Sequence, residues 1–151
     1  MEKKEAVDLK YSSTRGNGVK LDSAQAIIQG LATDGGLFVP DSLPKVDASF
    51  VAALQDLSYE ERAAKVLGLF LTDYTEEEVK GCVTRAYGNG KFDAAMRAPV
   101  KIFDDMGVLE RWHGPTSAFK DMALQLLPQL MSTALKKTGE TDEGLILVAT
   151  S

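Results

Sequence analysis

One lysine of this chain stands where amine chemistry is expected. Lys120 follows a Gly- and Pro-containing segment that begins at His113, and an apolar pattern with helical spacing starts at Phe119. The pattern places Lys120 in the first turn of a helix, where the field of the peptide dipoles disfavours an ammonium. A neutral amine is a nucleophile that can form a Schiff base with an aldehyde. The alternative is a solvated surface lysine, and the surrounding residues must decide between the two.

The neighbours of this lysine have simpler interpretations. Thr116 and Ser117 are predicted to cap the helix first and to contact a ligand second. Asp121 is expected to support the helix start. His113 is the only histidine, and a lone histidine is more often a hydrogen-bonded structural residue than a catalytic one, although its ordinary pKa permits both roles. The only cysteine, Cys82, lies on an apolar helix face and is expected to pack as a small hydrophobic residue.

Composition narrows the class of protein. The chain has 151 residues, a net charge of −5 and 44% hydrophobic residues, which suits one ordinary domain with a core. An acidic balance argues against nucleic-acid backbones and anionic membrane surfaces as partners. No run approaches the roughly 20 apolar residues of a membrane span, and the first residues lack the apolar core of a signal peptide. A single cysteine excludes an internal disulfide and fits a reducing compartment, so a cytoplasmic location is expected.

The first part of the chain is predicted to be mostly helical. A short strand is expected at 8–13 and an extended piece at 37–40. Apolar spacing and cap residues predict four helices, over 23–29, 47–57, 58–71 and 75–87. The acidic run at 76–78 reads as first-turn charge rather than as a metal site, and no metal is expected. Glycines around residue 89 then suggest a boundary between a helical N-terminal domain, residues 1–90, and a second region, residues 91–151.

The second region reads as the beginning of an α/β domain. Two strands at 100–103 and 108–112 are expected to form a hairpin around the turn 104–107. The lysine helix should run to Thr138, with a kink at Pro128 and an end at Gly139. An apolar run at 145–149 is typical of a buried parallel strand. The fold class is therefore α/β, and an unpaired edge of that strand predicts self-association.

Residues 113–121 resemble the Schiff-base lysine segment of the threonine synthases, which are pyridoxal-phosphate (PLP) enzymes of fold type II. That family writes His-Gly-Pro-Thr, one variable residue, then Ala-Phe-Lys-Asp, and Ser117 holds the variable place. The blocks 11–16, 34–40 and 149–151 also resemble the family and stand in its order. Within the first block, Arg15 is either a surface turn residue or an anion contact.

The resemblance implies a fold, a reaction and a set of site residues. Residues 91–151 would be the first strands and lysine helix of a fold type II PLP domain, without its later part. Lys120 would hold pyridoxal 5'-phosphate, and Phe119 would lie beside it. The reaction would convert the small-molecule substrate O-phospho-L-homoserine and water to L-threonine and phosphate. Thr150 and Ser151 would begin the loop that holds the substrate carboxylate.

The resemblance covers 11–151 but only about the first third of such an enzyme. The later glycine-rich loop that binds the PLP phosphate in the family lies beyond Ser151, so the isolated chain is expected to be an inactive fragment. Two alternatives stay open. One is a threonine-synthase-like phospholyase that uses the same lysine on another phosphorylated amine. The other is a non-catalytic fragment or interaction domain.

Overall fold

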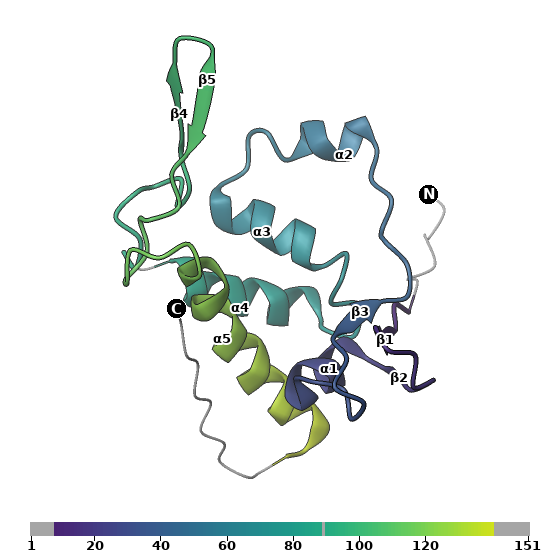
Figure 1. Ribbon diagram of the computed structural model, residues 1–151. Helices are drawn as coiled ribbons and strands as arrows, with labels where there is room; N and C mark the ends of the chain where they lie inside the picture. The colour runs from purple at the N-terminus through teal and green to yellow at the C-terminus, as the bar shows by residue number, and fades with distance from the viewer. Residues whose placement is uncertain (1–7, 89, 141–151) are drawn as a thin grey trace.

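Helices are the main regular structure in the part of the chain that the computed structural model describes, residues 8–88 and 90–140. The helices are α1 (Ser23–Gln29), α2 (Ala48–Ala53), α3 (Tyr59–Leu67), α4 (Glu76–Tyr87) and α5 (Asp121–Thr138). Four of these five helices, α1, α3, α4 and α5, pack against one another. A small sheet lies on one side of them and a hairpin projects on another (Figure 1). The strands are β1 (Tyr11–Ser13), β2 (Lys20–Leu21), β3 (Phe38–Pro40), β4 (Val100–Phe103) and β5 (Met106–Leu109).

The small sheet has β1 in its centre, antiparallel to β2 and to β3. The turn before β3 is fixed by Asp34, whose carboxylate accepts hydrogen bonds from the Ser13 hydroxyl at 2.7 Å and from the Gly36 amide at 2.9 Å. Gly36 is needed because a Cβ at this position would overlap the Ser13 hydroxyl. Gly35 has a φ of 76°, which confirms the predicted use of glycine in this turn, whereas Leu37 and Val39 are exposed and do not pack as predicted.

Helix α1 has the predicted bounds and is held from a distant part of the chain. Asp73, in the loop between α3 and α4, accepts a hydrogen bond from the Ala24 amide at 3.0 Å and another from the Ser23 hydroxyl. A carboxylate at this end of a helix satisfies free amides and complements the helix dipole. The cap joins α1 to the α3–α4 loop.

Helices α2 and α3 are both shorter than predicted. α2 ends near Ala53 because none of its residues is buried, so packing does not extend it. The carbonyls just beyond it are bound instead by Arg62, which donates to Leu54 O at 2.8 Å and to Gln55 O at 2.6 Å. α3 ends at Leu67 and does not continue to residue 71 as predicted. Leu69 N and Phe70 N bond to the carbonyls three residues earlier, Val66 O and Leu67 O.

Helices α4 and α5 form the centre of the core. α4 has its predicted bounds and its predicted capping box between Thr75 and Glu78. Its buried face was also predicted correctly: Val79, Cys82, Val83 and Ala86. These residues pack in one cluster with three residues of α5: Leu126, Leu130 and Ala134.

Side chains of the N-terminal region also donate to the backbone of α5. The Tyr74 hydroxyl donates to Leu130 O at 3.1 Å, and the Tyr87 hydroxyl donates to Met122 O at 2.8 Å. Pro128 lies inside α5 and has no amide proton to donate, yet the helix continues to its predicted end, where Gly139 has a φ of 74°. The kink at Pro128 stays a prediction.

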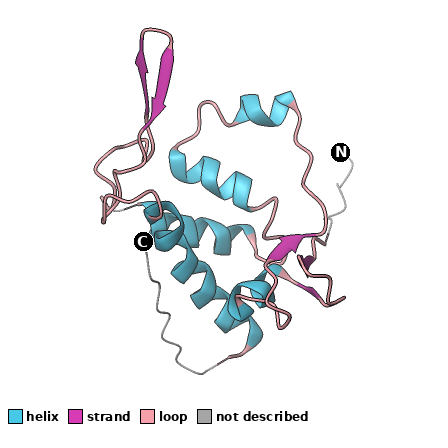
Figure 2. Cartoon of the chain, viewed as in Figure 1, coloured by secondary structure: helices cyan, strands magenta, loops and turns pink. Residues whose placement is uncertain are grey.

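The hairpin of β4 and β5 differs in detail from its prediction. Phe103 pairs with Met106, so the turn consists of Asp104 and Asp105 rather than residues 104–107, and β5 ends at Leu109 rather than at 112. Asp104 adopts a φ of 53°, as the tight turn requires. All residues of both strands are exposed, and Figure 2 shows the hairpin standing away from the helices.

The described residues therefore form a mixed helix and strand structure. The strand predicted at 145–149 lies outside them. Within the described ranges, no helix is long and apolar enough to cross a membrane.

Candidate active site

Lys120 is the residue immediately before the first turn of α5. Its backbone is helical, with φ −65° and ψ −19°, and its carbonyl accepts hydrogen bonds from Ala123 N at 3.0 Å and Leu124 N at 2.9 Å. The predicted location at the start of a helix is thus confirmed to within one residue. The side chain is half-buried. Across residues 8–88 and 90–140 its amine has no ion pair and no hydrogen bond.

The prediction that Thr116 and Ser117 cap this helix is wrong. Lys120 holds the cap position and no side chain caps the helix there. Thr116 instead donates to the carboxylate of Asp121, from its amide at 2.8 Å and from its hydroxyl at 2.7 Å. Ser117 has a φ of 58° and donates its amide to Gly114 O at 3.0 Å, so it belongs to a turn. The Thr116 hydroxyl donates its hydrogen bond to the Asp121 carboxylate and does not cap the helix.

Asp121 organises the lysine segment, as the sequence suggested. Its side chain is only 1% exposed. A Cβ built on Gly114 would lie 2.5 Å from the Cβ of Asp121, which is far closer than a real contact. The absence of a side chain at Gly114 therefore lets the turn close on the carboxylate. The backbone between Gly114 and Asp121 is thus fixed at both ends, by the close approach at Gly114 and by the hydrogen bonds between Thr116 and Asp121.

Phe119 lies directly before the lysine and exposes 55% of its surface. The guanidinium carbon of Arg111 lies 5.2 Å from the centre of its ring, a cation–π geometry. Phe119 therefore presents an aromatic side chain at the surface next to Lys120.

His113 begins the lysine segment between two carboxylates. Its Nδ1 lies 2.5 Å from Asp93 Oδ1 and its Nε2 lies 2.8 Å from Glu110 Oε2. The hydrogen bond to Glu110 and then the one to Asp93 raise the pKa of His113. The ring of Trp112 stacks near the imidazole, with centroids 5.8 Å apart. Sequence reasoning missed the contribution of Asp93, since 20 residues separate it from His113 with no pattern to link them.

The remaining candidates are Arg15, Thr150 and Ser151, together with the question of a metal site. Arg15 donates to Asp34 O at 3.0 Å and is exposed, which supports its interpretation as a surface turn residue. Thr150 and Ser151 lie outside the described residues. Among the residues described, no group of three or more His, Cys, Asp and Glu could hold a metal ion.

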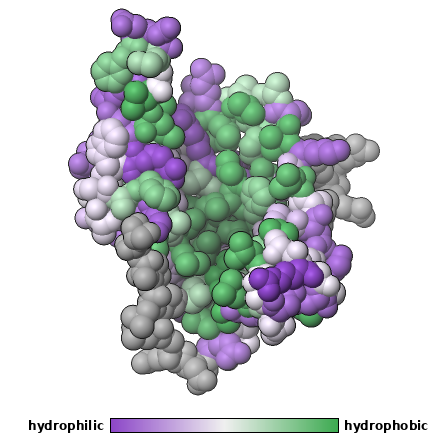
Figure 3. Space-filling view, viewed as in Figure 1, coloured by the Kyte–Doolittle hydropathy of each residue, from purple (hydrophilic) through white to green (hydrophobic). Residues whose placement is uncertain are grey.

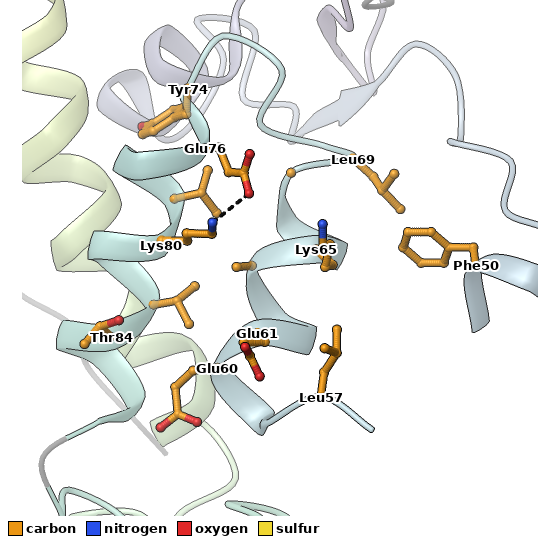
Figure 4. Close-up of a pocket in the computed structure, with 14 residues that line it drawn as sticks. Phe50, Leu57, Glu60, Glu61, Lys65, Leu69, Tyr74, Glu76, Lys80 and Thr84 are labelled. Atoms are coloured by element: carbon orange, nitrogen blue, oxygen red, sulfur yellow. Dashed lines mark ion pairs between the residues drawn. The ribbon is translucent and has the colours of Figure 1, made fainter. Parts of the chain in front are cut away.

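A cavity of about 700 Å³ lies elsewhere, between α3 and α4. Its wall includes Phe50 and Leu69 on one side and Val79 on the other, and an ion pair of 2.7 Å between Glu76 and Lys80 lies at its edge (Figure 4). No residue of the lysine segment lines it. The cavity is therefore separate from the candidate active site.

Comparison with known proteins decides the family. The family model described as threonine synthase N terminus matches residues 10–87, which is just over half of the chain. The chain belongs to the threonine synthase family. This confirms the relationship that the lysine segment and the other sequence blocks indicated.

Curated threonine synthases align along most of the chain. The threonine synthase of Pseudomonas aeruginosa is 39% identical over 145 residues, which cover 95% of this chain and 30% of the relative. The threonine synthase of Schizosaccharomyces pombe is 37% identical over 137 residues, covering 88% of this chain and 26% of the relative. A protein named threonine synthase-like 2 from Xenopus laevis is 33% identical over 146 residues. The chain thus spans less than a third of the length of these relatives.

Solved threonine synthase structures share the fold of the described region. A crystal structure of PLP-bound threonine synthase from Brucella melitensis matches with a TM-score of 0.80 and 38% identity, over 87% of this chain and 28% of that one. Threonine synthase from yeast matches with a TM-score of 0.77 and 34% identity, over 90% of this chain and 28% of that one. The mixed helix and strand structure is therefore that of the N-terminal portion of a threonine synthase.

Proposed function

We propose that this chain carries the cofactor lysine of a PLP-dependent threonine synthase, and that Lys120 is that residue. The reaction would convert O-phospho-L-homoserine and water to L-threonine and phosphate. The observation that carries the proposal is the location of Lys120 in a threonine synthase chain, at the start of α5, with an amine that makes no ion pair or hydrogen bond within 8–88 and 90–140. An amine that no carboxylate of these described residues holds is available for covalent chemistry.

The residues present fit PLP. When bound, PLP supplies an electron sink for negative charge that develops on the substrate carbon. Lys120 would hold the cofactor through its amine and, once released, would carry protons between substrate positions. Phe119 offers an exposed aromatic face beside the amine. Asp121 and Thr116 hold the backbone that leads to the lysine and take no part in the chemistry.

The remaining features of the proposal concern the rest of the chain. Thr150 and Ser151 would bind the substrate carboxylate. Residues 1–90 would form an N-terminal domain, and residues 91–151 would begin the PLP domain of fold type II. A reducing, cytoplasmic location is proposed because Cys82 is a free and buried thiol. The chain by itself would hold too little of the site for turnover, because it spans less than a third of its relatives.

The test is a PLP titration of the 151-residue chain followed by absorbance. The proposal expects a saturable band from lysine-bound PLP that is lost in Lys120→Ala. Lys136→Ala is the matched control, because Lys136 is an exposed lysine at the other end of α5. Equal loss of the band in both variants would remove Lys120 from the proposal. No saturable band in the wild type would mean that this chain carries the lysine of a PLP enzyme without its cofactor site, and would favour a non-catalytic fragment or interaction domain.

A phospholyase that uses another phosphorylated amine is the second candidate. The relative named threonine synthase-like 2 keeps it open, since it aligns with 95% of this chain. The band of bound PLP should change on addition of O-phospho-L-homoserine and stay unchanged with O-phospho-L-serine. The reverse response would favour the phospholyase.

A further inference from the structure

A cluster of three charged residues joins the lysine segment to an earlier loop. His113 binds Asp93 through Nδ1 at 2.5 Å and Glu110 through Nε2 at 2.8 Å. The backbone amide of Asp93 also donates to His113 O at 3.0 Å. Asp93 lies between α4 and β4, and Glu110 directly follows β5. The first residue of the lysine segment is thus bound to both sides of the hairpin.

The geometry requires a protonated imidazole. Ionised carboxylates only accept hydrogen bonds, so both ring nitrogens of His113 must donate, and only the imidazolium has two N–H groups. A neutral ring would turn a lone pair toward either Asp93 or Glu110. These two carboxylates are the charged groups that face the ring. The side chains of His113 and Glu110 are 17% and 16% exposed, whereas that of Asp93 is 78% exposed, so the bond to Glu110 is the more shielded from water.

We propose that His113 is a positioning residue for the Lys120 site: as an imidazolium it fixes the beginning of the lysine segment, and loss of its proton loosens that segment. The inference rests on the proposed function of Lys120. Asp121 fixes the other end of the same segment through Thr116. The segment that carries Lys120 is therefore held at two points. The contact at Asp121 belongs to the first residue of α5, whereas the contact at His113 depends on the protonation of the imidazole.

The direction of the pH effect follows from the geometry. Both carboxylates favour the protonated ring, so the pKa of His113 is higher in the folded chain than in the unfolded chain. The cluster then contributes fully to stability below the ordinary histidine pKa of about 6.5, and its contribution is lost as the pH rises through the higher folded pKa. The lysine segment should be most tightly held on the acidic side of this titration.

The first test is an NMR titration of the imidazole, which is unambiguous because the chain has one histidine. The pKa of His113 should lie above its ordinary value. Glu110→Gln should lower it more than Asp93→Asn, because Glu110 is the larger cause of the shift and is less exposed. An ordinary pKa in the wild type, or equal values in all three proteins, would overturn the inference.

The second test follows the lysine itself without PLP. The chain is labelled at its amines across a range of pH, and mass spectrometry gives the ratio of Lys120 labelling to Lys136 labelling. We expect this ratio to rise as His113 loses its proton, because the segment loosens. In Glu110→Gln the rise should move to lower pH together with the pKa of His113, and His113→Gln should show a high ratio without the step. A flat wild-type ratio, or an unchanged step in His113→Gln, contradicts the positioning role.

These readouts separate the inference from the proposed function. A labelling step without a Lys120-dependent cofactor band means that this chain does not bind PLP through Lys120, and it leaves the pH-dependent attachment in place. A Lys120-dependent band without the labelling step overturns the role of His113 alone. Glu110→Gln retains the histidine, so the inference stays testable if His113→Gln fails to fold, which circular dichroism would reveal.

Discussion

The helical core and the β4–β5 hairpin place similar apolar side chains in opposite environments. In the core, Leu130 is 7% exposed and Val83 is 1% exposed, whereas Ile102 and Phe103 in the hairpin are 69% and 57% exposed. The difference lies in the packing partners. α5 packs against α1 and α4, whereas β4 and β5 pair mainly with each other. Figure 3 shows hydrophobic residues on the surface of the hairpin as well as over the hollowed face below it.

The lysine segment, residues 113–121, connects these two regions. Its C-terminal end continues into α5, which the core holds through buried side chains and through the hydroxyls of Tyr74 and Tyr87. Its N-terminal end follows the hairpin, and a two-stranded hairpin alone is marginally stable in water. The lysine is therefore supported firmly from one side, and on the other side the His113 cluster replaces the packing that the hairpin lacks.

The largest expected effect is the loss of stability when a core side chain, rather than a hairpin side chain, is shortened. Leu130→Ala removes buried methyl groups from the core and is expected to lower the free energy of unfolding by about 2–5 kcal/mol. Ile102→Ala makes a similar deletion on the exposed hairpin and should change it by less than about 0.5 kcal/mol. Urea unfolding followed by circular dichroism measures both. Similar losses in the two variants would mean that the hairpin is buried in solution.

The next effect tests the join between the core and the lysine segment. Asp121→Ala removes the acceptor of both hydrogen bonds from Thr116, which should cost about 1–3 kcal/mol of unfolding free energy. Thr116→Val keeps the amide bond and should lose less. Asp105→Ala, in the hairpin turn, is the control and should be silent. If Asp121→Ala were silent too, the carboxylate would not organise the segment.

A smaller effect concerns the dependence of stability on pH, to which tyrosines of the core and of the small sheet contribute. All four tyrosines lie within residues 8–88, and burial raises the pKa of each of them: Tyr11, Tyr59, Tyr74 and Tyr87. Above about pH 10 the unfolded chain loses tyrosine protons that the folded chain keeps, so stability should fall as the pH rises.

Two variants measure the tyrosine contribution. Tyr74→Phe and Tyr87→Phe should each lower stability at neutral pH by about 0.5–1.5 kcal/mol, because each hydroxyl donates to a carbonyl of α5. Each should also make stability fall less steeply above pH 10. Unfolding curves at pH 7 and pH 10.5 provide the comparison. An unchanged alkaline slope in both variants would show that these hydroxyls are not held in the core.

Local sequence signals predicted the parts of the fold that depend on nearby residues. The capping box of Thr75 and Glu78, followed by a helical apolar stripe, correctly predicted α4. Gly139 ended α5 as expected. The helix at 47–57 was predicted too long because its apolar spacing is real but its residues are not buried, and spacing alone does not reveal a missing partner.

Long-range contacts could not be predicted in the same way. Asp73 caps α1 across 49 residues, and Asp93 binds His113 across 20. At the lysine segment, the sequence correctly indicated Lys120 at a helix start, and the interpretation of the Thr116 hydroxyl as a cap failed because Asp121 competes for it. The competing carboxylate was visible in the sequence, but the turn that brings it to Thr116 was not.

Substitutions in the hairpin are expected to change stability least, so their effect is better measured as a change in self-association. Ile102 shares one face with Val100 and Leu109, and this face is exposed, so a second copy of the chain can cover it. Ile102→Lys should shift sedimentation toward monomer and leave the free energy of unfolding within about 0.5 kcal/mol of wild type. Leu43→Lys is the control, because Leu43 is 76% exposed in a loop. A wild-type chain that stays monomeric at high concentration would show that exposure of the hairpin alone does not drive association.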